Sequence, residues 1–199
     1  MTAQIEQQYP SAYSQIEKST VALGFTMASD VLTCSLLRTL ASTKPAGKFL
    51  ELGTGTGLST SWILDGMDSA STLVSIDNDP SFLSIAETNL SGDKRLSLLN
   101  TDGGEWIATN KNSTFDFIFA DTWHGKYLLL NETLSMLNDG GLYIIDDLLP
   151  QPNWPAGHEN KVLKLIQSLE MRNDLTITKQ NWATGIIIAS KKQYRLTNN

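Results

Sequence analysis

The sequence predicts a doubly wound α/β fold, in which helices cover both faces of a parallel sheet. Two observations lead to this prediction. From Lys48 onward, short runs of β-type residues that end in Gly or Asp alternate with longer helical stretches. Runs such as FDFIFA and GLYII are apolar on both faces, as expected for strands buried between two layers of helices.

The central elements follow one another from Lys48 to Ile145. We expect strands at Lys48–Leu52, Ser71–Ile76, Leu96–Leu99, Phe115–Ala120 and Gly141–Ile145. Between these strands we expect helices at Leu58–Met67, Pro80–Leu90, Gly103–Thr109 and Lys126–Leu137. The short connections between them favour a βαβ arrangement rather than separate layers of strands and helices.

Two further helices are expected before this run, at Ala3–Tyr13 and Ser29–Leu40. The second has Val31 and several leucines at i, i+4 spacing, which is typical of an amphipathic helix. Its start is marked by Ser29 or Asp30, because both residue types are good N-caps.

After the run we expect a helix at Lys161–Met171 and strands at Leu175–Lys179 and Gly185–Ser190. A turn at Trp182–Gly185 predicts that these strands form a hairpin at the edge of the sheet. No linker or internal repeat interrupts the chain. The sequence therefore predicts one domain over 1–199, with N-terminal helices in 1–45 and the α/β core in 46–199.

The composition excludes several functional classes. The chain has 199 residues, 41% of them hydrophobic, which is enough for one sizeable core. Its 15 basic and 21 acidic residues give a net charge of −6, which disfavours a nucleic-acid partner. Cys34 is the single cysteine, so no intrachain disulfide can form. The first twenty residues lack a signal-peptide pattern and no apolar run could cross a membrane, so we expect a cytoplasmic protein without a membrane partner.

A glycine-rich turn follows the first expected strand in the segment ELGTGTG. The glycines Gly53, Gly55 and Gly57 allow a sharp turn, close approach to a ligand and the start of a helix. The dinucleotide pattern G-x-G-x-x-G would need glycine or alanine where this chain has Leu58. Glu51 suits a ligand with a cationic amine better than a pyrophosphate. The alternative is a turn that merely joins strand and helix.

Two acids follow the next two strands. Asp77 ends the second strand, where a carboxylate can bind both hydroxyls of a ribose. Its alternative role is to cap the helix that begins at Pro80. Asp102 follows the third strand, where it would reach the edge of an adenine, or would act only as a helix N-cap.

In this order, ELGTGTG, SID and NTD resemble the class I S-adenosylmethionine-dependent methyltransferases, from about Phe49 to Ser190. The resemblance implies a Rossmann-like sheet of seven strands in the order 3-2-1-4-5-7-6, with strand seven antiparallel. It also implies that Glu51 lies near the methionine amine of S-adenosyl-L-methionine, Ser59 near its carboxylate and Asp77 on its ribose. The glycines Gly53, Gly55 and Gly57 and the adenine-side Asp102 complete the expected cofactor site.

A second group of acids follows strands four and five. Asp121 begins the segment DTWHGKY after strand four, and Asp146 and Asp147 close strand five. In a doubly wound sheet these positions are neighbours at the carboxyl edge, where ligands bind. Three converging carboxylates either repel one another or share a hard divalent cation such as Mg²⁺. The alternative is an acidic loop edge with a solvated histidine.

This pattern is similar to that of the cation-dependent O-methyltransferases, of which catechol O-methyltransferase is a member. The motif D-x-W-x-x-x-Y carries the resemblance, as does the acid pair after strand five. Met27 agrees with it, because the family has a methionine at that distance before the acid of strand one. The resemblance implies that Met27 and Trp123 contact the cofactor and the acceptor pocket. It also implies a metal site formed by Asp121, Asp146 and Asp147.

Two residues depart from that family. Asp147 stands where the family has asparagine, which keeps an oxygen ligand but adds a negative charge. His124 stands at the position of the catechol enzyme's lysine base, and a histidine can take a proton near neutral pH. Lys126 could replace it only if the loop curls. We therefore expect His124 and Asp121 to be catalytic.

The sequence predicts an S-adenosylmethionine-dependent O-methyltransferase, assisted by a divalent cation such as Mg²⁺. The loop 148–158 contains three prolines and Trp154, which predicts an apolar rim for a small aromatic or amphipathic acceptor. His158 is expected to cap or precede the next helix. A homodimer is expected from the resemblance. Three alternatives remain: a metal-independent N- or carboxyl-methyltransferase, an NAD-dependent oxidoreductase, and a non-catalytic cofactor-binding protein.

Overall fold

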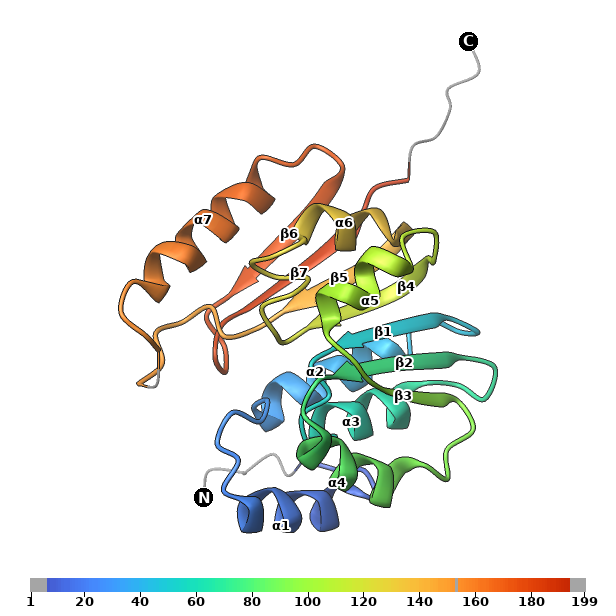
Figure 1. Ribbon diagram of the computed structural model, residues 1–199. Helices are drawn as coiled ribbons and strands as arrows, with labels where there is room; N and C mark the ends of the chain where they lie inside the picture. The colour runs from blue at the N-terminus through green and yellow to red at the C-terminus, as the bar shows by residue number, and fades with distance from the viewer. Residues whose placement is uncertain (1–6, 153, 194–199) are drawn as a thin grey trace, which may run out of the picture.

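The computed structural model describes residues 7–152 and 154–193. In this part of the chain one sheet is formed by β1 (Lys48–Leu52), β2 (Thr72–Asp77), β3 (Leu96–Asn100), β4 (Phe115–Ala120), β5 (Leu137–Ile145), β6 (Leu175–Gln180) and β7 (Ile186–Lys191). The strand order is β3-β2-β1-β4-β5-β7-β6 (Figure 1). Strands β1 to β5 pair in parallel, and β7 is antiparallel to β5 and β6. The fold class, the strand order and the antiparallel seventh strand are confirmed.

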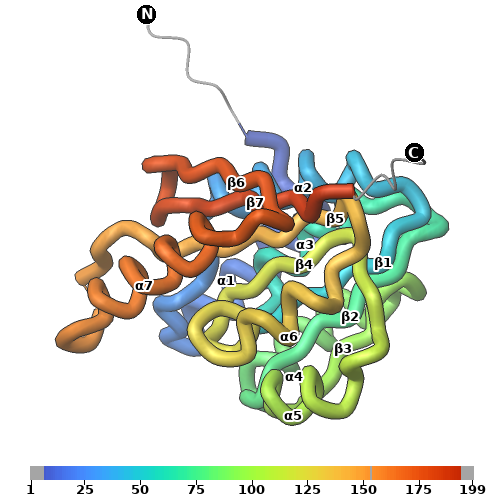
Figure 2. The backbone as a smooth tube through the Cα atoms, turned by 90° about the horizontal axis from the view of Figure 1, so that it is seen from above, coloured from blue at the N-terminus to red at the C-terminus, as the bar shows by residue number. Residues whose placement is uncertain are grey.

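Helices cover both faces of this sheet. They are α1 (Tyr13–Leu23), α2 (Val31–Ala41), α3 (Leu58–Gly66), α4 (Pro80–Leu90), α5 (Gly103–Thr109), α6 (Leu130–Ser135) and α7 (His158–Glu170). One hydrophobic core holds the buried residues of α1 to α4, and a second holds those of α5 to α7. Figure 2 shows α7 beside the β6–β7 hairpin, with α4 and α5 near β3 at the other end of the sheet.

Strand β4 illustrates why the sequence runs are apolar on both faces. Phe117 and Phe119 are fully buried in the core beneath α1 to α4. Ile118 and Ala120 alternate with them and are fully buried in the core beneath α5 to α7. Because successive side chains of a strand point to opposite faces, a strand between two helical layers needs apolar residues at every position.

The expected helix Ala3–Tyr13 is wrong over the residues that the structure describes, and residues 1–6 lie outside them. Helix α1 instead begins at Tyr13 and ends at Leu23, and its C-cap Gly24 has a left-handed backbone (φ 74°). The reason lies in Pro10, which disfavours helical backbone at the preceding residue. Its carbonyl oxygen accepts a hydrogen bond from the amide of Tyr13, closing a turn at the helix start (3.0 Å).

The expected helix Lys126–Leu137 is also wrong over most of its length. Only Leu130–Ser135 is helical, as α6, and Leu137 already belongs to β5. The residues before α6 form a curled loop, because Leu129 has a left-handed backbone (φ 57°) and residues 124 and 128 form an isolated β-bridge. This loop lies next to the candidate site.

The remaining elements agree with the sequence prediction to within a few residues. Helix α2 is capped by Asp30, whose carboxylate accepts the backbone N–H of Leu32 (2.7 Å). The β6–β7 hairpin forms the expected edge of the sheet. In the described part of the chain, no helix has the length and apolar character needed to span a membrane.

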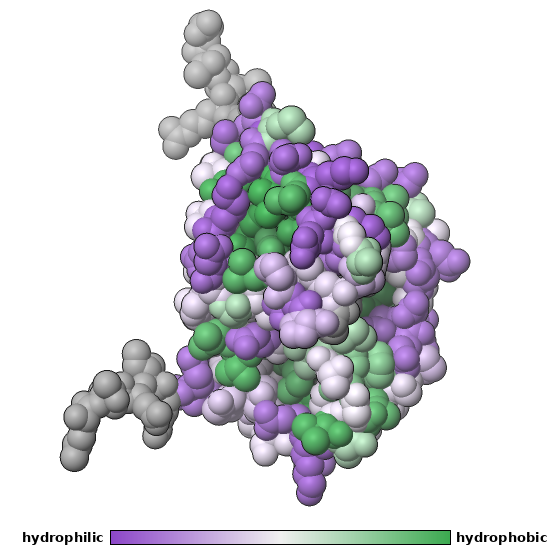
Figure 3. All heavy atoms as spheres, turned by 90° about the vertical axis from the view of Figure 1, so that its left-hand side faces the viewer, coloured by the Kyte–Doolittle hydropathy of each residue, from purple (hydrophilic) through white to green (hydrophobic). Residues whose placement is uncertain are grey.

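On the face that forms the left-hand side of Figure 1, several patches of hydrophobic residues lie among hydrophilic ones (Figure 3).

Candidate active site

A cavity of about 410 Å³ lies at the carboxyl ends of the parallel strands. The glycine loop after β1, the end of β2, the loops after β4 and β5, and the segment before α2 all contribute to its wall. It contains these sequence-predicted site residues: Met27, Gly53, Gly55, Ser59, Asp77, Asp121, Trp123 and Asp147. The other predicted site residues do not line the cavity. They are Glu51, Gly57, Asp102, His124 and Asp146.

The glycine loop passes close to the end of β4. Gly53 has a φ of +102°, and a Cβ atom there would lie 2.8 Å from the carbonyl oxygen of Asp121. A larger residue would therefore both strain the backbone and push the two loops apart. Glycine at this position therefore lets the loop after β1 approach Asp121 closely.

Glu51 lies one layer beneath the cavity. Its carboxylate is fully buried and accepts hydrogen bonds from the hydroxyls of Ser59, Thr60 and Ser75, each at 2.6 Å. Burial raises the pKa of Glu51 to about 7, although the three hydroxyls favour the ionised form. Of this group only Ser59 lines the cavity, so Glu51 acts on the cavity through the orientation of Ser59.

Asp77 fixes the shape of the glycine loop. One carboxylate oxygen accepts the backbone N–H of Gly55 (2.7 Å), and the other accepts that of Asp79 (3.0 Å). The helix α4 is capped by Asp79, which accepts the amides of Ser81 and Phe82, so the capping alternative for Asp77 is wrong. Each oxygen of Asp77 keeps a second lone pair, which is available to a hydroxyl in the cavity.

Asp102 caps α5 by accepting the amides of Gly104 (2.8 Å) and Glu105 (3.0 Å). Its other oxygen lies 3.7 Å from Nδ1 of His124. The ring of His124 packs on the start of α5, where a Cβ on Gly104 would lie 2.9 Å from it. His124 thus joins the loop after β4 to α5, and the capping alternative for Asp102 is confirmed.

Lys126 lines the cavity beside the acids, whereas His124 does not line it. The loop curls at Gly125 (φ +83°), where a Cβ would lie 2.4 Å from Leu52, and it is closed by the Gly125 amide bonding to the Leu128 carbonyl (2.7 Å). Lys126 is 4% exposed, lines the cavity and has its Nζ 3.9 Å from Oδ1 of Asp146. The sequence named Lys126 as a replacement for His124 on the condition that the loop curls, and this condition is met.

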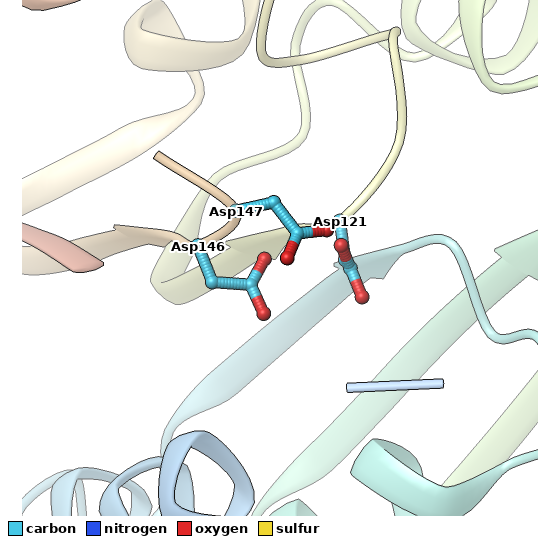
Figure 4. A group of neighbouring side chains, drawn as sticks. All are labelled: Asp121, Asp146 and Asp147. Atoms are coloured by element: carbon cyan, nitrogen blue, oxygen red, sulfur yellow. The ribbon is translucent and has the colours of Figure 1, made fainter. Parts of the chain in front are cut away.

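The three acids of the second group converge. Asp121 follows β4, Asp146 and Asp147 follow β5, and one oxygen from each lies within 4.8 Å of the others (Figure 4). Oδ1 of Asp146 is buried and has no hydrogen-bond partner among the described residues. Burial and the charge of Asp121 raise the pKa of Asp146 well above its ordinary value. Burial likewise raises the pKa of Asp121, while Lys126 opposes the shift.

This donor set fits a hard divalent cation. Three carboxylate oxygens are available, and the single ammonium of Lys126 offsets only part of the repulsion among the three carboxylates. A bound cation would remove the rest. Asp147 has a left-handed backbone (φ 53°), which Asp and Asn adopt at lower energy than most residues. Aspartate and asparagine would therefore both preserve the backbone and the oxygen ligand at this position.

An aromatic wall, made of Trp123, Tyr127, Trp154 and His158, borders the cavity. The ring of His158 lies 4.6 Å from that of Trp154 and 5.2 Å from that of Tyr127, measured between centroids. The Nζ of Lys161 lies 4.1 Å above Trp123. His158 is the first residue of α7, directly after the N-cap Gly157. The expectation that His158 caps or precedes this helix is therefore wrong, because the helix begins three residues before Lys161.

The segment 25–29 closes the remaining side of the cavity. The ring of Phe25 stacks at 4.4 Å on Phe82, and Ser29 donates a hydrogen bond to Asp121 (2.8 Å). The preceding α1 is fixed to the glycine loop by a hydrogen bond between the hydroxyls of Thr20 and Thr56 (2.7 Å). These contacts were not foreseen from the sequence, because they depend on how a surface segment folds back over the sheet.

Comparison with known proteins agrees with this geometry. Residues 50–148 match the family model described as a methyltransferase domain. A protein from Mycobacterium ulcerans named "Putative O-methyltransferase" is 27% identical over 118 residues, which are 56% of this chain and 52% of that protein. The chain thus spans about half the length of the curated relatives that it matches.

Solved structures share the fold over nearly the whole chain. An O-methyltransferase from Bacillus cereus, in complex with SAH, has a TM-score of 0.81 at 18% identity, covering 94% of this chain and 93% of its own. The O-methyltransferase TomG from Streptomyces achromogenes, in complex with SAM, has a TM-score of 0.78 at 20% identity, covering 95% and 92%.

The strand order, the glycine loop and the acids at the strand ends together define a Rossmann-like methyltransferase fold. Over residues 50–148 the chain is also similar in sequence to the methyltransferase domain family.

Proposed function

We propose that this protein is an S-adenosylmethionine-dependent O-methyltransferase that acts on a hydroxyl group of a small acceptor. The observation that carries the proposal is the sharing of one cavity by two sets of residues. Asp77 and the glycine loop suit a nucleoside with a cationic side chain, and Asp121, Asp147 and Lys126 suit the ionisation of a hydroxyl. A methyl donor and its acceptor must meet within one such space.

The donor would bind at the end of the cavity formed by the glycine loop. Asp77 accepts hydrogen bonds from the ribose hydroxyls through its remaining lone pairs, as in other nucleoside sites at this edge of a sheet. Ser59 contacts the methionine end, with the carboxylate of Glu51 behind it. Met27 covers the donor from the side of the segment 25–29. The acidic surroundings favour a sulfonium ion with a cationic amine.

Lys126 is our candidate for the general base, in place of His124. The ammonium of Lys126 first loses a proton to solvent. Its neutral Nζ then removes the proton of the acceptor hydroxyl, and a lone pair of that oxygen forms the new bond to the methyl carbon. The carbon–sulfur bond breaks with its electron pair moving to sulfur, so the products are S-adenosylhomocysteine and the methyl ether. Asp146, at 3.9 Å, receives the protonated lysine as an ion pair.

Asp121, Asp146 and Asp147 would hold a divalent cation such as Mg²⁺. When bound, the cation lowers the pKa of an acceptor hydroxyl beside it. The three side chains keep their oxygens toward one point, and Ser29 positions Asp121 by its hydrogen bond. The aromatic wall excludes water from the acceptor and favours a small aromatic or amphipathic molecule.

One observation favours a second candidate, a metal-independent methyltransferase acting on a hydroxyl, amine or carboxylate. Lys126 already brings a buried cation to Asp146, so the carboxylates are partly neutralised without a metal ion. In that case chelation by EDTA leaves methyl transfer unchanged, and added Mg²⁺ has no effect on its rate.

The proposal is tested first by titration calorimetry with S-adenosylhomocysteine and, separately, NADH. We expect binding of S-adenosylhomocysteine and none of NADH; the reverse result would overturn the proposal. Transfer of a labelled methyl group from S-adenosylmethionine to a panel of phenols, aliphatic alcohols, amines and carboxylates then identifies the acceptor class. Binding without transfer to any acceptor would instead indicate a non-catalytic cofactor-binding protein.

A further inference from the structure

The aromatic wall contains one polar pair. The hydroxyl of Tyr127 and Nε2 of His158 lie 3.1 Å apart, and both residues line the cavity. They come from distant parts of the chain, since Tyr127 is in the loop after β4 and His158 begins α7. His158 is 8% exposed. The proposed chemistry of Lys126 and the three acids uses neither residue.

Both partners of this pair are neutral. Burial raises the pKa of Tyr127 to about 12, with the carboxylates of Asp147, Asp146 and Asp121 acting in the same direction. Burial lowers the pKa of His158, as do the nearby charges of Lys126 and Lys161. The pair therefore holds two protons, one on the phenol and one on the imidazole.

The position of the imidazole proton follows from the other ring nitrogen. Nδ1 of His158 is buried and has no hydrogen-bond partner among the described residues. A proton on Nδ1 would leave a buried N–H donor unsatisfied and would commit the Tyr127 O–H to Nε2. A proton on Nε2 is donated to the Tyr127 oxygen and leaves Nδ1 as an unpartnered acceptor, which folded proteins tolerate more readily than an unpartnered N–H. Tyr127 then has its own O–H free, and the described residues include no further partner for it.

We propose that Tyr127, held by His158, is a specificity-determining residue that donates a hydrogen bond to a second oxygen of the acceptor, apart from the hydroxyl that is methylated. The geometry favours hydroxylated aromatic acceptors that also carry a hydrogen-bond-accepting group such as a carbonyl. The proposal rests on the proposed function, because it takes the aromatic wall as the acceptor side of the cavity.

The first test is the tautomer of His158 in the intact protein. Two-dimensional NMR of ¹⁵N-labelled imidazole distinguishes Nε2–H from Nδ1–H by the shifts of the two nitrogens. We expect the Nε2–H form in the wild type, and a protonated Nδ1 would overturn the proposal. This measurement needs neither an acceptor nor methyl transfer.

The second test measures binding of a matched pair of phenols to the complex with S-adenosylhomocysteine and Mg²⁺, where no turnover occurs. 4-Hydroxyacetophenone and 4-ethylphenol, and their meta isomers, differ by a carbonyl oxygen at similar shape. We expect the wild type to prefer the ketone of at least one pair by about 3- to 10-fold, the range of one neutral hydrogen bond. Failure to bind either, or equal binding, would overturn the proposal.

Variants of Tyr127 and His158 test whether this pair causes the preference for the ketone. Tyr127→Phe and His158→Phe should each abolish the preference, whereas His158→Gln should retain it, because the glutamine amide can donate from the position of Nε2. Circular dichroism and melting temperature check that each variant is folded. If His158→Phe keeps the preference, the holding role of His158 is refuted. If the wild type binds the ketone more tightly but transfers no methyl group, the proposed function is refuted and this inference stands.

Discussion

At the scale of single residues, the different positions of Lys126 and His124 lead to the sharpest prediction. Lys126 lines the cavity and lies near Asp146, whereas His124 packs on α5. Lys126→Met should lower kcat by about 100-fold or more, the usual contribution of a general base. His124→Gln should keep kcat within a few-fold. Steady-state kinetics of the two variants, measured with one acceptor, compares them directly.

The control for lost charge is Lys126→Arg. Arginine keeps a cation beside Asp146 but cannot release its proton near neutral pH. It should restore the melting temperature that Lys126→Met lowers by leaving Asp146 unpaired, without restoring activity. Affinity for S-adenosylhomocysteine should stay within about two-fold in all three variants. Full turnover by Lys126→Arg would refute the assignment of Lys126 as the base.

Glu51 predicts how stability depends on pH. Its pKa is about 7 in the folded protein, against an ordinary 4.5, so between these values the folded chain holds the proton more tightly than the unfolded chain. The stabilisation is complete below pH 4.5 and is lost as pH rises through 7. It amounts to roughly 3 kcal/mol at about 1.4 kcal/mol per pH unit.

Denaturant unfolding of the wild type and Glu51→Gln at pH 5.5 and 7.5 measures this effect. The free energy of unfolding of the wild type should fall between the two pH values by more than that of the variant. The buried Asp121 and Asp146 contribute in the same direction in both proteins, so the difference between the two slopes belongs to Glu51. Equal slopes would contradict the prediction.

At the scale of elements, the curled loop between β4 and α6 decides where Lys126 points. Gly125→Ala would place a Cβ 2.4 Å from Leu52 in a left-handed backbone, and it would displace the carbonyl that accepts the Tyr143 hydroxyl (2.5 Å). We expect a lower melting temperature together with a kcat reduced at least ten-fold, because Lys126 moves with the loop. Thermal melting and kinetics on one preparation test both expectations.

Gly157→Ala is the matched control for that change. Gly157 also has a left-handed backbone (φ +81°), but a Cβ there would meet no atom within 4 Å. Its substitution should cost only about 1 kcal/mol of backbone strain. If Gly125→Ala behaves like Gly157→Ala in stability and activity, the loop is not what positions Lys126.

Local signals explain which elements the sequence could predict. Strand β4 and the helices α4 and α5 have their predicted bounds, because a two-faced apolar run, the pair Asp79-Pro80 and the cap Asp102 are all local features. The wrong helix over Lys126–Leu137 has suitable apolar spacing. It fails because the loop bends at Gly125, and because the carbonyl of Gly125 accepts the hydroxyl of Tyr143 in β5. Neither the bend nor this contact is visible in a single sequence.

The same distinction applies to the site. The glycine loop, Asp77 and the three acids could be predicted, because strand ends in a parallel sheet meet at one edge. The direction of Lys126 and the pairing of Tyr127 with His158 could not, since both depend on how irregular loops curl. The predicted roles of His124 and of the metal ligands stay predictions.

At the scale of the whole molecule, the topology concentrates negative charge. Strands β4 and β5 are neighbours in parallel register, with Phe119 opposite Ile144, so the acids that follow them must converge. The net charge of −6 is therefore partly local to this edge of the sheet. Repulsion among these acids opposes folding, and a bound cation would relieve it.

Divalent cations should consequently stabilise the folded protein. At a concentration 100-fold above its Kd, a ligand of the folded state adds about 2.7 kcal/mol to the free energy of unfolding. For a chain of this size that corresponds to a rise of roughly 5–10 °C in melting temperature. Thermal melting with Mg²⁺, Mn²⁺ or Ca²⁺ after EDTA dialysis measures the rise. Asp146→Asn should abolish most of it, whereas the exposed Asp139→Asn should leave it unchanged. If no cation raises the melting temperature of the wild type, the acids do not form a metal site, and the metal-independent reaction with Lys126 as the cation is favoured.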